Sequence, residues 1–351
     1  GIYAEAWRKK DMLTPKENYL KVLNGETPEW IPTYTLGANK DNVMECPSIL
    51  FEPSPINGHR VNNGGPDIWG VNYVGCEEAG GAILPEPNNF ILDDITKWRD
   101  VIKAPDLTGV DWEACAKKEF DNTGIDRKYT AVAYNTHLGY FQLLMSFMGF
   151  SNGLMALFEE PEECKALLEY LSDFYCSVIE KTIDIYKPDV YTMMDDTAAW
   201  ANPFISMSMY KEFFYPLYEK QAKFANDRGI PITFHNCGKC QAFMEEAHNF
   251  GVISWDPAQS CNDLDGFKAK YGNSYVICGG WDGRDKLLGD DVTDEQIYES
   301  VRATINRLAP NGGFLWCGGF LGAIGDEKII HKNSVVKKAV DEIGKTFYKH
   351  N

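Results

Sequence analysis

A histidine and a cysteine stand two residues apart just after a short apolar run, Ile232–Phe234. Such a run, bounded by polar and glycine residues, is typical of a buried strand. Side chains at positions i and i+2 of a strand project to the same side, so His235 and Cys237 can reach one bound ion. Because zinc binds imidazole and thiolate ligands, the pair predicts a zinc site at a strand end.

Cys317 is the best candidate for a third ligand. It ends a second short apolar run and precedes two glycines. Three protein ligands leave the fourth position of a tetrahedral zinc for a substrate atom, which distinguishes catalytic zinc sites from structural ones. We therefore predict that His235, Cys237 and Cys317 bind one catalytic zinc.

Two other interpretations of these residues stay open. A histidine or cysteine near a strand end often only packs in a core. Cys237 and Cys240 also have the C-x-x-C spacing of a redox pair, although no compact thioredoxin-like pattern surrounds them. The zinc interpretation is favoured over both, and Cys240 is expected not to be a ligand.

The motif His235-x-Cys237-Gly, followed later by Cys317-Gly-Gly, resembles the uroporphyrinogen decarboxylase superfamily. More narrowly, it is similar to the zinc-containing cobamide-dependent methyltransferases, typified by methylcobamide:coenzyme M methyltransferases, whose ligands are one His and two Cys in this order. The likeness extends from about Thr14 to the last helix. It implies methyl transfer to or from corrinoid cobalt. A separate protein would carry the corrinoid, because the chain lacks an Asp-x-His-x-x-Gly corrinoid-binding segment.

One departure from the decarboxylases concerns substrate charge. Those enzymes carry an arginine-rich segment near the first strand that clamps substrate carboxylates, whereas residues 31–40 of this chain contain no arginine. A tetrapyrrole with many carboxylates would also meet a chain of net charge −17. Unpaired charges brought into such a site carry a desolvation cost of several kcal/mol. Porphyrinogen decarboxylation is therefore disfavoured.

The residues that could bind zinc must be positioned by strands that alternate with helical stretches after Trp112. The predicted strands are Ala131–Tyr134, Val190–Met194, Ile230–Phe234, Val252–Trp255, Tyr275–Cys278 and Phe314–Trp316. Ile31–Leu36 gives a seventh strand, and an eighth is expected in the irregular N-terminal third. Alternation of this kind specifies parallel pairing. We predict an α/β fold, a distorted (β/α)8 TIM barrel.

The domain organisation follows from the same pattern. We expect one domain over residues 1–351, with an N-terminal helical extension over 1–30 and an irregular insertion over 37–105 that holds a short hairpin. Thr14 and Glu17 have the spacing of a capping box, which predicts a helix start there. The clearest helix runs from Glu162 to Lys187, because apolar residues recur along one face.

Polar residues recur where the predicted strands end, the edge at which barrel enzymes place their active sites. Asp195 and Asp196 follow one strand, and we predict that one of them is catalytic and accepts a hydrogen bond from the substrate or the corrinoid partner. His137, Asp256 and Asp282 follow other strands, and each could instead serve as a turn or loop cap. The same ends carry large apolar residues that predict an aromatic-lined cavity. They are Tyr191, Met194, Trp200, Trp255, Trp281 and Trp316.

The composition narrows the class of protein. With 51 acidic against 34 basic residues, the surface should repel nucleic acid and anionic membranes, so neither is an expected partner. No apolar run of about 18 residues and no signal peptide is visible, which predicts a cytoplasmic protein. Ten cysteines without the dense spacing of a secreted scaffold fit a reducing compartment.

The combined prediction is a zinc-dependent methyltransferase that moves a methyl group between a small substrate and the cobalt of a corrinoid protein. The favoured substrate is a methoxylated aromatic, which would make the reaction an O-demethylation. An alternative is transfer from methylcobamide to a thiol such as coenzyme M, or to tetrahydrofolate. Uroporphyrinogen decarboxylation and a non-catalytic binding barrel are weaker hypotheses.

Overall fold

The computed structural model of the chain describes residues 12–36, 47–77 and 80–349. The first part of the predicted N-terminal extension, residues 1–11, and the first part of the predicted insertion, residues 37–46, lie outside this description.

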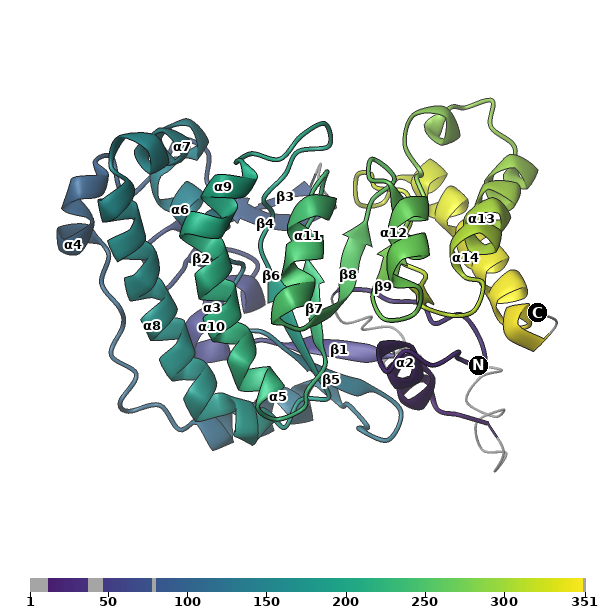
Figure 1. The fold of residues 1–351 in the computed structure, drawn as a ribbon, viewed down its shortest axis with the longest axis horizontal. Helices are drawn as coiled ribbons and strands as arrows, with labels where there is room; N and C mark the ends of the chain where they lie inside the picture. Colours follow the sequence, from purple (N-terminus) through teal and green to yellow (C-terminus); the bar gives the residue numbers. More distant parts are fainter. Residues whose placement is uncertain (1–11, 37–46, 78–79, 350–351) are drawn as a thin grey trace.

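A curled, seven-stranded parallel sheet forms the centre of the fold (Figure 1), in the order β1-β5-β6-β7-β8-β9-β10. Beyond β10, Thr33 forms an isolated parallel bridge with Trp316. The fold is a distorted TIM-like barrel, as predicted. The strands are β1 Ser48–Phe51, β5 Ala131–Tyr134, β6 Val190–Met194, β7 Ile232–His235, β8 Val252–Ala258, β9 Val276–Gly279 and β10 Phe314–Leu315.

The predicted strands after Trp112 are all present, with ends that differ by a few residues. The expected eighth strand is β1, which lies in the N-terminal third and pairs with β5. The segment Ile31–Leu36 is less regular than expected, because only the Thr33 bridge joins it to the sheet.

Helices cover the outside of the sheet. In Figure 1, α8, α10, α11 and α12 stand side by side in front of the strands. Both predicted helix features are confirmed, since Thr14 and Glu17 form a capping box before α2 and α8 spans nearly the predicted range. The longer helices are α2 Pro15–Leu23, α3 Ser54–Val61, α5 Trp112–Thr123, α6 Tyr140–Met148, α7 Phe150–Glu159, α8 Pro161–Tyr186, α10 Tyr215–Asn226, α11 Gln241–Ala247, α12 Leu264–Tyr271, α13 Asp294–Leu308 and α14 Glu327–Gly344.

Strand side chains divide between two apolar clusters. The larger cluster contains the outward-facing strand residues and the helices packed on them. The smaller cluster lies inside the barrel and includes Ala131, Ala133 and Val190. Tyr19 and Leu23 of α2 belong to this inner cluster, so α2 fills the N-terminal end of the barrel with apolar side chains. Polar inward-facing residues are therefore concentrated at the C-terminal ends of the strands.

The predicted insertion is more regular than expected, because it contains β1, α3 and a small antiparallel sheet. That sheet consists of β2 Gly65–Pro66, β3 Asn72–Cys76 and β4 Ala82–Pro85, and it includes the predicted hairpin. A Cβ atom placed on Gly81 would lie 3.4 Å from Ile324 Cδ1. The end of the hairpin thus lies against the segment that follows β10.

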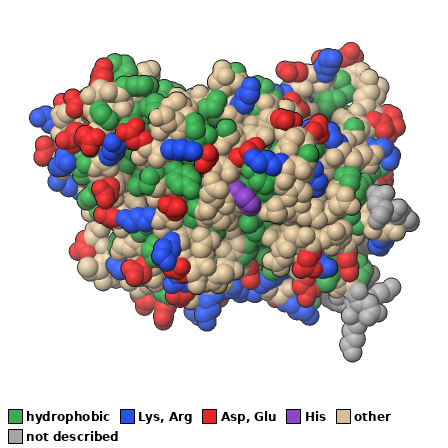
Figure 2. Space-filling model, in the orientation of Figure 1, with side chains coloured by type: hydrophobic (Ala, Val, Ile, Leu, Met, Phe, Trp, Pro, Cys, Tyr) green, Lys and Arg blue, Asp and Glu red, His purple; other side chains and the backbone are tan. Residues whose placement is uncertain are grey.

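The face of the molecule seen in Figure 2 carries acidic and basic side chains interspersed with apolar ones. Within the described residues, no single helix is long and apolar enough to cross a membrane, and the one adjacent pair that passes this test, α6 with α7, is bent by 109°.

Candidate metal centre

Three potential metal ligands meet at the C-terminal ends of β6 and β7. The ligand atoms of Asp196, His235 and Cys237 all lie within 4.8 Å of one another. Cys237 Sγ is 3.6 Å from His235 Nε2, and Asp196 Oδ1 is 3.9 Å from the same nitrogen. The predicted His–Cys pair is therefore confirmed as a spatial pair, and a carboxylate joins it.

Backbone contacts between two loops position these side chains. Asp196 Oδ1 accepts a hydrogen bond of 2.8 Å from the Cys237 backbone N–H. The Asp196 backbone N–H in turn donates to Gln142 Oε1 at 3.0 Å. Gly238 has a φ of +82°, and a Cβ there would lie 2.5 Å from the Ala198 carbonyl oxygen. Glycine is therefore required for the loop after β7 to approach the loop after β6.

Asp256 orients the His235 ring. His235 Nδ1 lies 2.8 Å from Asp256 Oδ2, and because a carboxylate accepts, Nδ1 donates and Nε2 is the ring nitrogen that faces Cys237. Burial acts to lower the pKa of His235, but the Asp256 charge raises this pKa well above its usual range. A carboxylate that holds the second ring nitrogen is the usual support of a metal-bound histidine.

The sequence interpretation left Asp256 open as a possible turn residue. The feature that could have indicated its contact with His235 is the parallel register of β7 and β8, in which His235 is paired with Asp256. Adjacent parallel strands lie close enough for facing side chains to touch, so two polar residues at paired strand ends are expected to interact.

The donor set fits zinc. A tetrahedral zinc with one nitrogen and one sulfur ligand at usual bond lengths places these two atoms about 3.5 Å apart, which agrees with the 3.6 Å between Cys237 Sγ and His235 Nε2. Nitrogen, sulfur and carboxylate oxygen are all established zinc ligands.

Cys317 follows β10 and faces the interior, where it packs against the inner cluster with Leu315. It hydrogen-bonds with Cys278, and burial together with this contact raises the pKa of the Cys278 thiol. Among the described residues, the compact ligand group contains Asp196 rather than Cys317. The role of Cys317 in zinc binding stays a prediction.

Cys240 occupies a different environment from Cys237. Its side chain is buried, and its thiol donates to the Asn236 carbonyl oxygen at 3.3 Å. Burial raises the pKa of Cys240 well above its usual value. Burial also raises the pKa of Cys237, so it is the contact with the Asn236 carbonyl oxygen that gives Cys240 the geometry of a packing residue.

Asp195 points away from the group formed by its neighbour. Its carboxylate is fully buried and accepts hydrogen bonds from Phe141 N at 2.8 Å, Gln142 N at 3.0 Å and Tyr218 Oη at 2.5 Å. These contacts hold the N-terminus of α6, where a carboxylate is favoured. Burial raises the pKa of Asp195 to about 7.

His137 and Asp282 lie in separate networks. His137 Nδ1 accepts the Gly139 backbone N–H at 3.0 Å, and its other nitrogen donates to Gln221 Oε1 at 3.1 Å. Asp282 accepts hydrogen bonds from Ser260 Oγ and from Arg284. His137 is fully buried, whereas Asp282 belongs to the outer part of the rim.

Most of the predicted cavity aromatics pack between the strands and the helices instead. Trp255 is fully buried against Phe267, and the rings of Trp281 and Trp316 contact each other in a tilted arrangement. Trp200 differs, because the Arg284 guanidinium lies over its ring. The prediction of an aromatic-lined cavity from these residues is thus wrong for the packed tryptophans, since strand alternation turns them outward.

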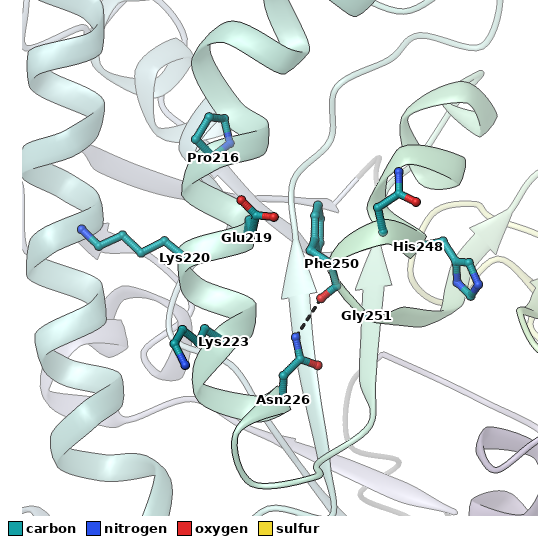
Figure 3. A pocket seen from close by; sticks show the side chains of 9 residues that line it. Pro216, Glu219, Lys220, Lys223, Asn226, His248, Phe250 and Gly251 are labelled. Carbon is teal, nitrogen blue, oxygen red and sulfur yellow. Dashed lines mark hydrogen bonds between the residues drawn. The ribbon is translucent and has the colours of Figure 1, made fainter.

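A groove of about 620 Å³ lies elsewhere, on the outer surface between α10 and the segment 248–251. Figure 3 shows its lining, including Asn226, which donates to the Phe250 carbonyl oxygen at 2.9 Å. Its two lysines, Lys220 and Lys223, form ion pairs with aspartates. The groove contains none of the candidate ligands, so it is separate from the metal centre.

Comparison with known sequences places this barrel in a family. The sequence pattern of uroporphyrinogen decarboxylase (URO-D) matches residues 136–319, a stretch that contains His235, Cys237 and Cys317. The chain belongs to the uroporphyrinogen decarboxylase family. No curated protein sequence matches it.

The fold of this family member is also found in a solved methyltransferase from Methanosarcina mazei. The two chains are 12% identical and superimpose with a TM-score of 0.63. The similarity covers 95% of this chain and 99% of the other. At this level of identity the comparison establishes a shared fold.

Proposed function

We propose that this protein is a zinc-dependent methyltransferase that moves a methyl group between a small methylated substrate and the cobalt of a corrinoid protein. The observation that carries the proposal is the pair His235 and Cys237, with Asp256 directing His235 Nε2 toward the thiol. The shared fold with a methyltransferase supports it.

His235, Cys237 and Cys317 would hold the zinc in this proposal. Cys317 faces the barrel interior. To bind the zinc, its thiol would give up its hydrogen bond with Cys278. A thiol–thiol hydrogen bond is weak, because sulfur is both a weak donor and a weak acceptor. Bound zinc would lower the pKa of a coordinated hydroxyl, thiol or water and so provide a leaving group or a nucleophile at neutral pH.

The surrounding residues would bind and orient the substrate. Asp196 keeps about a third of its side chain exposed, at 33%, and one of its oxygens lies 3.9 Å from His235 Nε2. In this proposal it would accept a hydrogen bond from a substrate group next to the metal. Asp256 holds the His235 ring in one orientation, and the apolar side chains of α2 close the opposite end of the barrel. The corrinoid protein would dock at the rim formed by the strand ends.

Decarboxylation is the activity in the family's name, and it would require free arginines to bind the substrate carboxylates. The region around α3 contains one arginine that could serve this purpose. Arg60 lies near the strand ends, but its Nε forms an ion pair with Glu52 Oε2 at 2.7 Å. Since this arginine is already neutralised, it offers little binding energy to the carboxylates of a porphyrinogen. Methyl transfer therefore remains the preferred function.

Two assays with the zinc-loaded chain test the proposal. In one, the reduced corrinoid partner is supplied with methoxylated aromatics, and in the other the methylated partner is supplied with free thiols or tetrahydrofolate. We expect methylation of the cobalt in the first assay, detected by its absorption spectrum. Reaction in the second assay alone would show that the enzyme transfers the methyl group from the corrinoid to an acceptor. If the chain is inactive in both assays but decarboxylates uroporphyrinogen in a third, methyl transfer is refuted.

A further inference from the structure

Five buried side-chain atoms among the described residues have no hydrogen-bond partner, and two of them are acceptors on the residues that directly follow β5 and β1. They are Asn135 Oδ1 and Glu52 Oε1. Asn135 is fully buried. Leaving a buried acceptor unpaired costs about 1–3 kcal/mol, so such groups normally have a partner, either ordered water or a bound ligand.

Both residues face the barrel interior. Leu50 of β1 is paired with Ala133 of β5, and both pack in the inner cluster. Glu52 and Asn135 each follow two residues later, and the Asn135 backbone N–H donates to the Phe51 carbonyl oxygen. Because side chains alternate along a strand, Glu52 and Asn135 share the face of Leu50 and Ala133. The two unpaired acceptors therefore lie on neighbouring strands of the same inner wall.

The identity of the unpaired atom in Asn135 is determined by its other contact. Asn135 Nδ2 donates to the Thr192 carbonyl oxygen at 2.6 Å. A carbonyl can only accept, so the nitrogen must be on that side and the free atom is the amide oxygen. This atom can be satisfied only by a hydrogen-bond donor.

The charge around Glu52 indicates which kind of ligand group could donate to the two unpaired acceptors. Glu52 Oε2 is paired with Arg60, which compensates its negative charge and leaves Oε1 free. An ammonium group bound there would add a second cation beside Arg60 without a second anion. A neutral donor, such as a hydroxyl group, meets both acceptors without this repulsion.

This pair of acceptors belongs to the wall that leads to the metal centre. Asn135 is level with Thr192, which is paired with Thr233, and His235 lies two residues further along that strand. In a flattened sheet this register separates the Cα atoms of Asn135 and His235 by about 12 Å. Because the side chains of both strands point into the barrel, a substrate bound at the metal centre would extend toward Asn135.

We propose that Glu52 and Asn135 bind a hydroxyl group of the substrate while its methyl-bearing heteroatom lies at the metal centre. The inference rests on the proposed methyltransferase function and specifies the substrate as a hydroxylated methyl ether, such as a methoxyphenol. Both residues lie outside the stretch 136–319 that matches the family pattern.

Two probes test the subsite. One is 2-methoxyphenol, which has a free hydroxyl group, and the other is 1,2-dimethoxybenzene, in which that hydroxyl group is methylated. Their dissociation constants are measured by calorimetry with the full zinc-loaded chain. We expect 2-methoxyphenol to bind at least about tenfold more tightly, because 1,2-dimethoxybenzene leaves the acceptors unpaired. In Asn135→Leu and in Glu52→Gln, this ratio should fall toward one. Glu52→Gln keeps the shape of the side chain and tests the proposal even if Asn135→Leu folds poorly.

Ser48→Ala is the matched control, since Ser48 faces the same side as Leu50 but lies at the N-terminal end of β1, away from the C-terminal ends where Glu52 and Asn135 lie. It should keep the wild-type ratio. Equal affinities in the wild type, no binding of either probe, or an unchanged ratio in both variants would overturn the subsite. Discrimination that persists in a chain inactive in both methyl-transfer assays would refute the proposed function and leave the subsite standing. Methyl transfer from both probes at equal rates would refute the subsite and leave the proposed function standing.

Discussion

Asp195 and Asp196 are adjacent in the chain and meet opposite environments. Asp195 is fully buried and satisfied by three protein donors at the start of α6. Asp196 is partly exposed and lies beside His235 and Cys237. At the scale of single residues, a partly exposed carboxylate that accepts from the Cys237 backbone N–H and, at 3.4 Å, from Gln142 Nε2 keeps acceptor capacity for substrate, whereas a saturated one supports structure. We assign the proposed catalytic role to Asp196.

The Asn variants of the two aspartates should separate these roles. Asp196→Asn is expected to lower turnover by roughly 10- to 100-fold through a lost acceptor, with zinc content unchanged. Asp195→Asn should instead lower the free energy of unfolding by about 1–3 kcal/mol, because an amide cannot accept from all three donors. Turnover and urea unfolding of both variants provide the measurement. Wild-type turnover in both would count against the assignment, and zinc loss in Asp196→Asn would identify Asp196 as a ligand.

Metal content tests the proposed ligand set residue by residue. Cys237→Ala and Cys317→Ala should each lose most of the zinc, because two remaining ligands bind it weakly. Cys240→Ala is the matched control, since its buried thiol contacts a backbone carbonyl, and it should retain zinc. Elemental analysis of the purified variants decides the question. Full zinc retention in Cys317→Ala would remove Cys317 from the set.

At the scale of elements, the metal centre depends on how closely two loops approach each other. The loop after β7 touches the loop after β6 through Gly238, where the Ala198 and Ala199 carbonyl oxygens leave no room for a Cβ. The Lys239 backbone N–H also donates to the Ala199 carbonyl oxygen. A displacement of this loop would move Cys237 relative to Asp196 and His235.

Gly238→Ala and Gly229→Ala form a matched pair that tests the contact between the loops. Both positions have positive φ, but a Cβ at Gly229 meets no atom within 4 Å. Gly229→Ala should cost about 1–2 kcal/mol of unfolding free energy from backbone strain alone. Gly238→Ala should cost roughly 1–3 kcal/mol more from overpacking and should also weaken zinc binding. Equal stability and equal zinc affinity in the two variants would show that the loop contact is unimportant.

At the scale of the whole molecule, buried polar groups outside the site couple stability to pH. His137 is neutral in the fold, because burial lowers its pKa to about 3. It contacts Tyr140 and Tyr175 and donates to Gln221. Protonation would require breaking this network or placing an unpaired charge among aromatic rings.

Acidification should therefore destabilise the protein in a defined pH window. The unfolded chain binds a proton at His137 near pH 6.5, whereas the folded chain does so only near pH 3, so the stability from neutral His137 is lost progressively below pH 6.5. Between pH 7.5 and 5.5 this residue alone should remove about 1.4 kcal/mol of unfolding free energy. Over the same pH interval, the free energy of unfolding of His137→Gln should fall by about 1.4 kcal/mol less than that of the wild type. An identical pH dependence in wild type and variant, measured by urea unfolding, would contradict this prediction.

Local patterns in the sequence were sufficient to predict much of the fold. The strands and α8 follow from apolar periodicity, and the start of α2 follows from its capping box. The proximity of His235 and Cys237 was predictable too, because it depends only on the two-residue repeat of a strand. These features are all determined within a few consecutive residues.

The tertiary structure alone decided which distant groups meet. Asp256 contacts His235, Asp196 joins the ligand group, and Cys317 pairs with Cys278. Each of these contacts depends on strand register and on loop packing between segments far apart in the chain. The same reason explains why Trp255 and Trp316, two of the predicted cavity tryptophans, face the helices. Alternation determines that neighbouring side chains point to opposite faces, but only the closed sheet determines which face is inside.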